Sequence, residues 1–298
     1  LERLTGKPIR TAHPIQRGYT PALRLHLTFA DDTTAFAKIG TTRLTSGWLR
    51  REKTVYETLH TSFMPEMLGW EDDGENPILL LEDLSHAHWP PPWSETQIQT
   101  LLNTLPEVWN ARLPNLPRLV DRPGLFMGWD EVSVDPEPFL SLELATEKWL
   151  DAALPVLLSI PAEKVVDGNA LLHTDIRSDN LCFISERVIL VDWNIVCLGN
   201  PDVDLGFFLP SLQTEGGPLP ETILPYAGEI AGIVSGYFAA YAGQDIIPDA
   251  PLVRHIQQVQ LNTALPWAVR ALDLPPLDGA KAPAAGITIN LQSHFKRS

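Results

Sequence analysis

Three polar residues near the middle of the chain have the types and the spacing that phosphoryl transfer requires. Asp175 and Asn180 stand five residues apart, and Asp192 follows at the end of an apolar run. In such a set, one carboxylate orients and deprotonates an attacking hydroxyl, while an amide oxygen and a second carboxylate hold a magnesium ion against nucleotide phosphates. We therefore interpret Asp175 as a general base, and Asn180 and Asp192 as magnesium ligands.

These residues also have ordinary structural interpretations. An aspartate in a loop before a strand is commonly a turn residue or a cap. Asp192, however, is preceded by the apolar run 188–191, and a carboxylate at the end of a buried strand lies at a cleft rather than on a solvated face. A zinc site is disfavoured because no second His or Cys stands at ligand spacing. His173 is expected to fix the loop by hydrogen bonds rather than to carry protons.

A lysine and a glutamate in the first third of the chain form a second candidate pair. Lys38 lies in the predicted strand 34–39, and Glu52 lies within an apolar stripe of the helix predicted after it. A desolvated carboxylate needs a cationic partner, because leaving it bare costs on the order of several kcal/mol. Lys38 is the natural candidate, with one of the arginines of residues 87–298 as the alternative.

The pattern His173-x-Asp175-x-x-x-x-Asn180 resembles the catalytic loop of the protein-kinase-like superfamily. The pair Asp192-Trp193, in place of Asp-Phe-Gly, makes the chain similar to the aminoglycoside phosphotransferase and choline kinase branch. The resemblance implies ATP and Mg²⁺ as cofactors and a hydroxyl of a small molecule as the acceptor.

The resemblance also implies a nucleotide site in the first part of the chain. Lys38 and Glu52 match the strand-lysine and helix-glutamate pair that positions the α- and β-phosphates. We assign two more residues to the nucleotide: Gly18, which lets the backbone of a short loop approach a ligand, and Glu82, which closes the predicted strand 77–81.

Two residues near the base complete the predicted site. Arg177 is placed to reach the γ-phosphoryl group, whose oxygens suit its planar guanidinium; the alternative is a surface arginine paired with Asp179 or Glu186. The segment 199–205 resembles the G-D-P-x-x-D-L-A segment of the branch, and by position Asp204 braces the catalytic loop.

The chain departs from the family pattern in four places. Thr174 replaces the usual glycine between His and Asp, Asn200 replaces an acidic residue, Arg177 stands where this branch often has His, and the loop 16–20 holds a single glycine. None of these changes removes a catalytic group, but the last weakens the case for clamping phosphates by backbone N–H groups.

Hydrophobic periodicity predicts the elements that position these residues. Alternation predicts a hairpin of strands 23–29 and 34–39, and a helix capped by Thr45 or Ser46 then runs to about His60. The later elements are a strand at 77–81, helices at 95–113 and 140–160, a hairpin of strands 181–184 and 188–191, and helices from 222 onward.

These elements predict an α+β, bilobal protein-kinase-like fold. The proline-rich stretch 86–93 marks the boundary between the lobes. We expect a small β-rich N-lobe at 1–86 and a larger, mainly helical C-lobe at 87–298, which carries the catalytic loop, the metal site and the acceptor pocket.

Composition limits the partners and the location. The 298 residues carry a formal charge of −15, which argues against a nucleic-acid partner and is compatible with a cationic substrate. Cys182 and Cys197 are expected to be buried thiols in a reducing compartment. The apolar stretch 223–242 is interrupted by Pro225 and Glu229, which favours a buried helix over a membrane span. With no signal peptide in the sequence, we expect a cytoplasmic protein without a membrane partner.

Three functions compete. The leading hypothesis is an ATP- and Mg²⁺-dependent small-molecule kinase, and aminoglycoside antibiotics and choline-like or sugar alcohols are the substrate classes of the resembled families. A protein kinase is disfavoured because no Ala-Pro-Glu motif follows Asp192. A catalytically silent nucleotide-binding module is disfavoured because every expected site residue is present.

The acceptor pocket is expected among the C-lobe helices. Trp149, Tyr237, Trp267 and Glu229 are candidates for lining a cationic pocket there. Aromatic residues at helix spacing are more often core, and this is the alternative interpretation.

Overall fold

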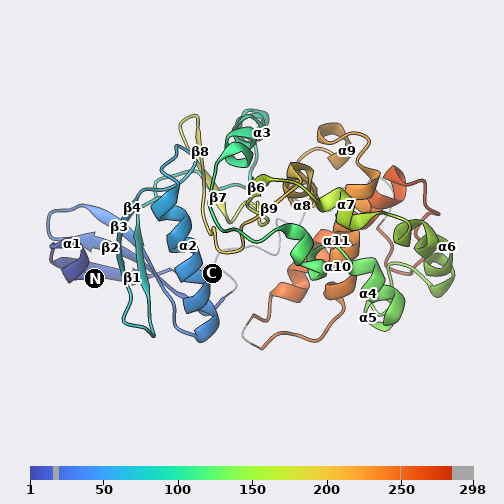
Figure 1. Ribbon diagram of the computed structural model, residues 1–298, viewed down its shortest axis with the longest axis horizontal. Coiled ribbons are helices and arrows are strands. Elements are labelled where there is room, and N and C mark those ends of the chain that lie inside the picture. The colour runs from blue at the N-terminus through green and yellow to red at the C-terminus, as the bar shows by residue number, and fades with distance from the viewer. Residues whose placement is uncertain (16–19, 249, 284–298) are drawn as a thin grey trace. The chain divides into compact units, whose positions relative to one another are not determined.

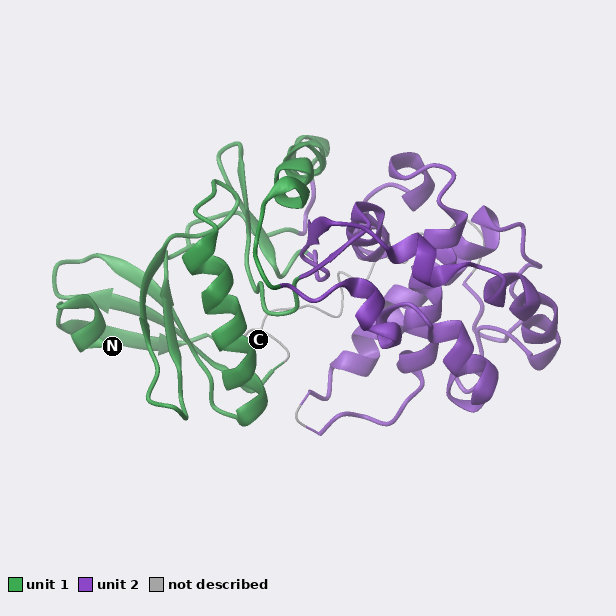
Figure 2. Cartoon of the chain, viewed as in Figure 1, with its two compact units in different colours: residues 1–90, 94–115, 178–196 green, residues 91–93, 116–177, 197–298 purple. Residues whose placement is uncertain are grey.

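The computed structural model describes residues 1–15, 20–248 and 250–283. The chain forms two compact units, which are coloured separately in Figure 2. Unit 1 comprises residues 1–90, 94–115 and 178–196, and unit 2 comprises residues 91–93, 116–177 and the chain from 197 onward. The units interleave along the sequence, and the lobe boundary at residue 86 stays a prediction.

Unit 1 is built on a five-stranded antiparallel sheet with the order β1-β2-β3-β5-β4. Its strands are β1 (Ile9–Pro14), β2 (Leu23–Phe29), β3 (Thr34–Ile39), β4 (Met67–Glu71) and β5 (Ile78–Leu81), and a short helix, α1 (Glu2–Thr5), precedes them. The predicted hairpin is β2 and β3, whose turn contains Asp32 in a left-handed conformation (φ 65°). Apolar side chains from one face, among them Leu27, Ala37 and Leu80, form a buried cluster.

Helix α2 (Arg43–Thr58) packs against β3, β4 and β5 (Figure 1). The prediction of a cap at Thr45 or Ser46 was wrong by one turn. The N-cap is Thr42, whose hydroxyl accepts from the Thr45 amide at 3.2 Å, and the Thr45 hydroxyl accepts from the Thr42 amide at 3.0 Å. This reciprocal pair is a capping box, in which Thr45 takes the place usual for Glu or Gln.

The rest of unit 1 is helix α3 (Glu95–Asn110) and the hairpin of β7 (Leu181–Ile184) and β8 (Arg187–Leu190). The hairpin pairs Leu181 with Leu190, and α3 packs against β8. Helix α3 ends three residues before the predicted end, because Ala111 is already extended.

Unit 2 is mainly helical. Its longest helices are α8 (Pro201–Thr214), α10 (Gly228–Ala242) and α11 (Val253–Ala271), and α10 packs against both of the others. The shorter elements are the 3-10 turns 119–121 and 123–125, α4 (Gly128–Val134), α5 (Glu137–Leu140), α6 (Glu147–Leu158), α7 (Ala162–Val166), α9 (Pro220–Ile223), and the paired strands β6 (Ala170–Leu172) and β9 (Cys197–Gly199).

The structure corrects the single helix predicted at 140–160. Glu143 has a left-handed backbone (φ 58°), and α6 begins only after Thr146, whose hydroxyl caps it. The stretch 223–242 is mostly α10, which is buried along most of its length. Within the part of the chain that the structure describes, no helix has the length and apolar character to span a membrane.

Both cysteines are buried and unpaired with each other. Burial raises the pKa of each thiol, Cys182 and Cys197, to about 12. Such thiols are protonated at neutral pH and act as small apolar side chains, as the sequence predicted.

Candidate active site

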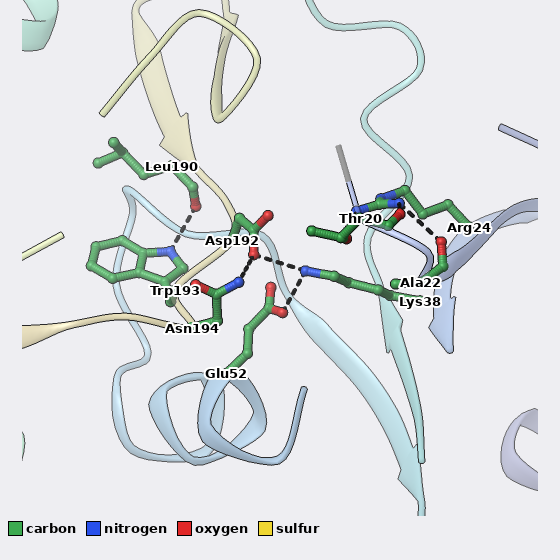
Figure 3. Close-up of polar contacts among 9 residues, drawn as sticks. All are labelled: Thr20, Ala22, Arg24, Lys38, Glu52, Leu190, Asp192, Trp193 and Asn194. Atoms are coloured by element: carbon green, nitrogen blue, oxygen red, sulfur yellow. Dashed lines mark hydrogen bonds and ion pairs between the residues drawn. The ribbon is translucent and has the colours of Figure 1, made fainter. Parts of the chain in front are cut away.

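The centre of unit 1 contains a lysine between two carboxylates (Figure 3). Lys38 Nζ donates to Glu52 Oε2 at 2.7 Å and to Asp192 Oδ1 at 2.9 Å. The predicted partners Lys38 and Glu52 are therefore in contact, with exposed fractions of only 9% and 1%. The sequence did not predict that Asp192 would join them, and a residue so far along the chain left no local signal.

Burial and the opposite charges act against each other at this centre. Burial acts to lower the pKa of Lys38, but the carboxylates of Asp192 and Glu52 outweigh it, so that the pKa lies above its usual value. Burial raises the pKa of Glu52, and the Lys38 ammonium opposes this shift. Lys38 thus stays cationic, and it is held in place at the end of β3 by α2 on one side and by the segment after β8 on the other.

Asn180 and Asp192 lie at the same end of the β7–β8 hairpin. Asn180 immediately precedes β7, and its carbonyl accepts from the amide of Val191, the residue before Asp192, at 2.9 Å. Both residues offer hard oxygens, an amide carbonyl and a carboxylate, which are the ligand types that Mg²⁺ takes together with water and phosphate. The residues present at the hairpin end therefore fit a magnesium ion, with their roles as ligands remaining a prediction.

The residues after Asp192 fix its position. Asp192 has a left-handed backbone (φ 67°), and Trp193 is fully buried, with its indole N–H donating to the Leu190 carbonyl at 2.9 Å. Asn194 Nδ2 donates to Asp192 Oδ1 at 2.6 Å. Sequence reasoning missed Asn194, although its position two residues after a candidate metal ligand was visible.

In unit 2, Asp204 fixes the loop that carries Asp175. Asp204 is fully buried in the first turn of α8, where the helix dipole favours a negative charge. Its carboxylate accepts from the backbone amides of His173 at 3.0 Å and Thr174 at 2.7 Å. The bracing predicted for Asp204 is present. The buried ring of His173 adds a further bond, because its Nδ1 accepts from the Asp175 amide at 3.3 Å.

Two departures from the family pattern lie at positions with a defined local conformation. Thr174 has a left-handed backbone (φ 66°), a conformation that glycine adopts without a steric cost and a β-branched residue rarely adopts. Asn200 is the N-cap of α8, and its side-chain oxygen accepts from the Asp202 amide at 3.1 Å. Asparagine serves this capping role as well as an acidic residue does.

Asp175 lies beside a cation. Arg177 Nε is 3.2 Å from Asp175 Oδ1, so the predicted phosphate-binding arginine contacts the predicted base itself. This pairing was not among the partners that the sequence suggested.

Tyr237 of α10 lies in the same neighbourhood. Its ring packs edge-on against Phe207 of α8 with centroids 5.3 Å apart, one turn beyond Asp204. Burial raises the pKa of Tyr237; a hydrogen bond with the Gln257 side chain opposes the shift, and the charge of Asp175 adds to it. Gln257 is in turn held by Arg254, whose Nη1 donates to Gln257 Oε1 at 2.9 Å.

The other acceptor candidates differ from Tyr237. Trp149 and Trp267 are buried in the core, and the Trp149 indole N–H donates to the Pro275 carbonyl at 2.7 Å. Trp149 and Trp267 are therefore core residues, which was the alternative interpretation of these two tryptophans. Glu229 is exposed in the first turn of α10.

Two residues assigned to the nucleotide remain without support. Gly18 lies outside the described residues. The Glu82 carboxylate accepts from the Glu66 amide at 3.1 Å and lies 3.7 Å from the Arg187 guanidinium. These contacts are structural, and a role of Glu82 at the nucleotide stays a prediction.

Solved structures of similar proteins include phosphotransferases and a kinase of small molecules. A macrolide 2′-phosphotransferase from Brachybacterium faecium is 12% identical over 90% of this chain and 89% of its own, with a TM-score of 0.48. A choline kinase from Cryptosporidium parvum is 11% identical over 87% and 80%, with a TM-score of 0.46. A type I macrolide 2′-phosphotransferase is 15% identical over 90% and 88%, with a TM-score of 0.47.

Comparison with curated protein sequences found no match. The profile of the phosphotransferase enzyme family, in contrast, matches residues 29–246, a range that includes Lys38, Glu52, Asp175, Asn180 and Asp192. This match spans well over half of the chain, and it agrees with the α+β, protein-kinase-like fold expected from the sequence. The chain belongs to the phosphotransferase enzyme family.

Proposed function

We propose that this phosphotransferase transfers the γ-phosphoryl group of ATP to a hydroxyl of a small molecule, with Mg²⁺ as the metal ion. The observation that carries the proposal is the buried pair Lys38 and Glu52, whose lysine also contacts the half-buried Asp192. Apolar residues of similar volume stabilise a fold at least as well as a buried ion pair does. A desolvated cation shared by two carboxylates is therefore better explained by a ligand than by stability.

In this proposal, unit 1 binds the nucleotide and the metal ion. Lys38 stays protonated and donates to phosphate oxygens, and Glu52 keeps its ammonium group in place. Asn180 and Asp192 would hold Mg²⁺ through their oxygens. A magnesium ion bound there would offset the negative charge of the phosphates.

The loop of unit 2 acts on the acceptor. The Asp175 carboxylate accepts the proton of the acceptor hydroxyl, whose oxygen forms a bond to the γ-phosphorus while the bond from that phosphorus to the β,γ-bridging oxygen breaks. ADP leaves with the electron pair of that bond. Arg177 donates to the γ-phosphoryl oxygens as they move, and Asp204 keeps the loop backbone fixed.

A panel of hydroxyl compounds tests the proposal. The purified protein is mixed with ATP, Mg²⁺ and one compound at a time, and ADP release is measured. The panel contains macrolides, amicoumacin and choline, which the names of similar solved structures suggest, together with aminoglycosides, neutral sugars and a peptide mixture. We expect acceptor-dependent ADP release with at least one small molecule and none with peptides.

The two competing functions give different results in the same experiment. A protein kinase would release ADP with the peptides alone. A silent module would bind ATP with Mg²⁺ but release no ADP with any compound. The proposal also includes a cytoplasmic location, where ATP is supplied, and a contribution to antibiotic resistance. If the chain confers resistance, a susceptible host that expresses it should show a raised minimal inhibitory concentration of the antibiotic that the enzyme phosphorylates.

A further inference from the structure

The segment Asp192–Asn194 folds back on itself. The buried Trp193 anchors it through the hydrogen bond to Leu190 and through a ring contact with Phe63, whose centroid is 5.9 Å away. The left-handed backbone at Asp192 changes the direction of the chain at this point. As a result, the Asn194 amide points at the Asp192 carboxylate (Figure 3).

One carboxylate oxygen of Asp192 accepts two hydrogen bonds. Lys38 Nζ is 2.9 Å from Oδ1 and Asn194 Nδ2 is 2.6 Å from it. Two donors that reach one oxygen from different parts of the chain restrict the rotation of the carboxylate. They thereby set the direction in which its lone pairs point.

The two donors differ in chemistry. Lys38 carries a charge, also contacts Glu52 at 2.7 Å, and in the proposed function donates to the nucleotide. Asn194 is neutral and belongs to the same short segment as Asp192. An amide donor orients a carboxylate without placing a further positive charge beside it, so that it does not oppose the binding of a divalent cation.

We propose that Asn194 is a positioning residue, which fixes the Asp192 carboxylate for a divalent cation. This inference rests on the proposed function, in which Asp192 is a metal ligand. The Asn194 bond lies outside β8 and β9 and closes no turn of either strand. Its main effect is on the carboxylate rather than on secondary structure.

The test compares metal binding in two matched variants. Asn194→Leu keeps the approximate shape of the side chain and removes the donor. Asn110→Leu is the control, because the Asn110 amide also makes one hydrogen bond within unit 1, to the Pro106 carbonyl at 2.7 Å, at the exposed end of α3. The affinity for Mn²⁺ is measured by electron paramagnetic resonance with the full chain and saturating AMP-PNP.

We expect Asn194→Leu to bind Mn²⁺ roughly 10–100-fold more weakly, which is the usual effect of removing an outer partner of a metal ligand. The control should bind Mn²⁺ as the wild type does. Binding of AMP-PNP in EDTA should be the same in all three proteins, because the metal-free nucleotide does not need the oriented carboxylate. Raising Mg²⁺ should restore much of the turnover of Asn194→Leu.

Unchanged Mn²⁺ affinity in Asn194→Leu would overturn the inference. So would an equal loss of AMP-PNP binding in EDTA, since Asn194 would then support the fold of the whole site. If Asn194→Leu does not fold, Asn194→Ala replaces it in the same comparison. A wild type that binds no Mn²⁺ with AMP-PNP would instead overturn the proposed function, and the inference with it.

Discussion

The two units hold their candidate catalytic carboxylates in different ways. In unit 1, side chains hold the carboxylate itself, because Lys38 and Asn194 both donate to Asp192. In unit 2, the backbone around the carboxylate is held, because Asp204 accepts from the amides of the two residues that precede Asp175.

The difference matches what each group has to do. A metal ligand must present its charge in one direction, and side-chain donors achieve this by restricting the carboxylate. A base must first meet a hydroxyl and then take its proton, and a fixed backbone sets its position while Arg177 and the substrate set its orientation. Mutations in the two units should therefore change different kinetic constants.

The largest effect is expected for Asp175→Ala. Loss of a general base lowers kcat by roughly 10²–10⁴-fold, and ATP affinity should stay nearly unchanged because the base acts on the acceptor. Steady-state kinetics with the best substrate and ATP titration measure both. Asp151→Ala, an exposed position on α6, is the control. Near-normal kcat in Asp175→Ala would show that another group is the base.

Asp192→Asn should mainly change the binding of ATP, in contrast to Asp175→Ala, which should mainly change kcat. Because a charged ligand is lost, the Mg²⁺ concentration required for ATP binding should rise by about tenfold or more. Titration of Mg²⁺ at fixed ATP measures this requirement. If the variant needs no more Mg²⁺ than the wild type, Asp192 only balances the charge of Lys38.

Arg177→Ala tests whether Arg177 contributes to the transfer step. A cation that meets charge developing on the phosphoryl group changes kcat more than KM, and the loss should be about tenfold or more at unchanged ATP affinity. Arg177→Lys, which keeps the charge without the planar fork, should recover part of the loss. A wild-type kcat in Arg177→Ala would show that Arg177 has no role in the reaction.

Tyr237→Phe asks whether the acceptor is bound beside Asp175. Removal of one hydroxyl should raise the acceptor KM by roughly 2–10-fold, the value of one hydrogen bond, with the KM for ATP unchanged. Tyr226→Phe, at a fully exposed position, provides the comparison. An unaltered acceptor KM in Tyr237→Phe would place the acceptor away from the Gln257–Tyr237 pair.

The smallest effect is expected for Thr174→Gly. Glycine relieves the left-handed backbone but makes the unfolded chain more flexible, so the stability should change by less than about 1 kcal/mol, in the stabilising direction. The same replacement at Thr54, on the exposed side of α2, should cost roughly 0.3 kcal/mol, the difference between the helix propensities of Thr and Gly. Equal destabilisation at both positions would mean that Thr174 makes contacts that outweigh its strain.

The sequence predicted well those features that depend on local spacing. The hairpin of β2 and β3 has the predicted bounds, and β7 has the predicted bounds as well. The contact between Lys38 and Glu52 could be predicted because a carboxylate within an apolar stripe needs a partner.

Features that depend on the tertiary structure or on single backbone angles could not be predicted. Asp192 meets Lys38 only because the segment after β8 lies beside β3 and α2 in unit 1. The break between α5 and α6 depends on the left-handed Glu143, which interrupts a sequence with helical periodicity. Trp149 and Trp267 have helix spacing that suits a pocket and a core equally, and only packing decides between them.

The discontinuity of unit 1 has a consequence for biosynthesis. The ribosome makes residues 1–115 long before the hairpin 178–196 that completes the unit, and at about 5–20 residues per second the delay lasts several seconds. During this time Lys38 lacks Asp192, and α3 lacks the strand against which it packs. We expect a chain truncated after residue 115 to aggregate rather than to form an independent domain, so that the nascent chain depends on chaperones until its middle third has been translated.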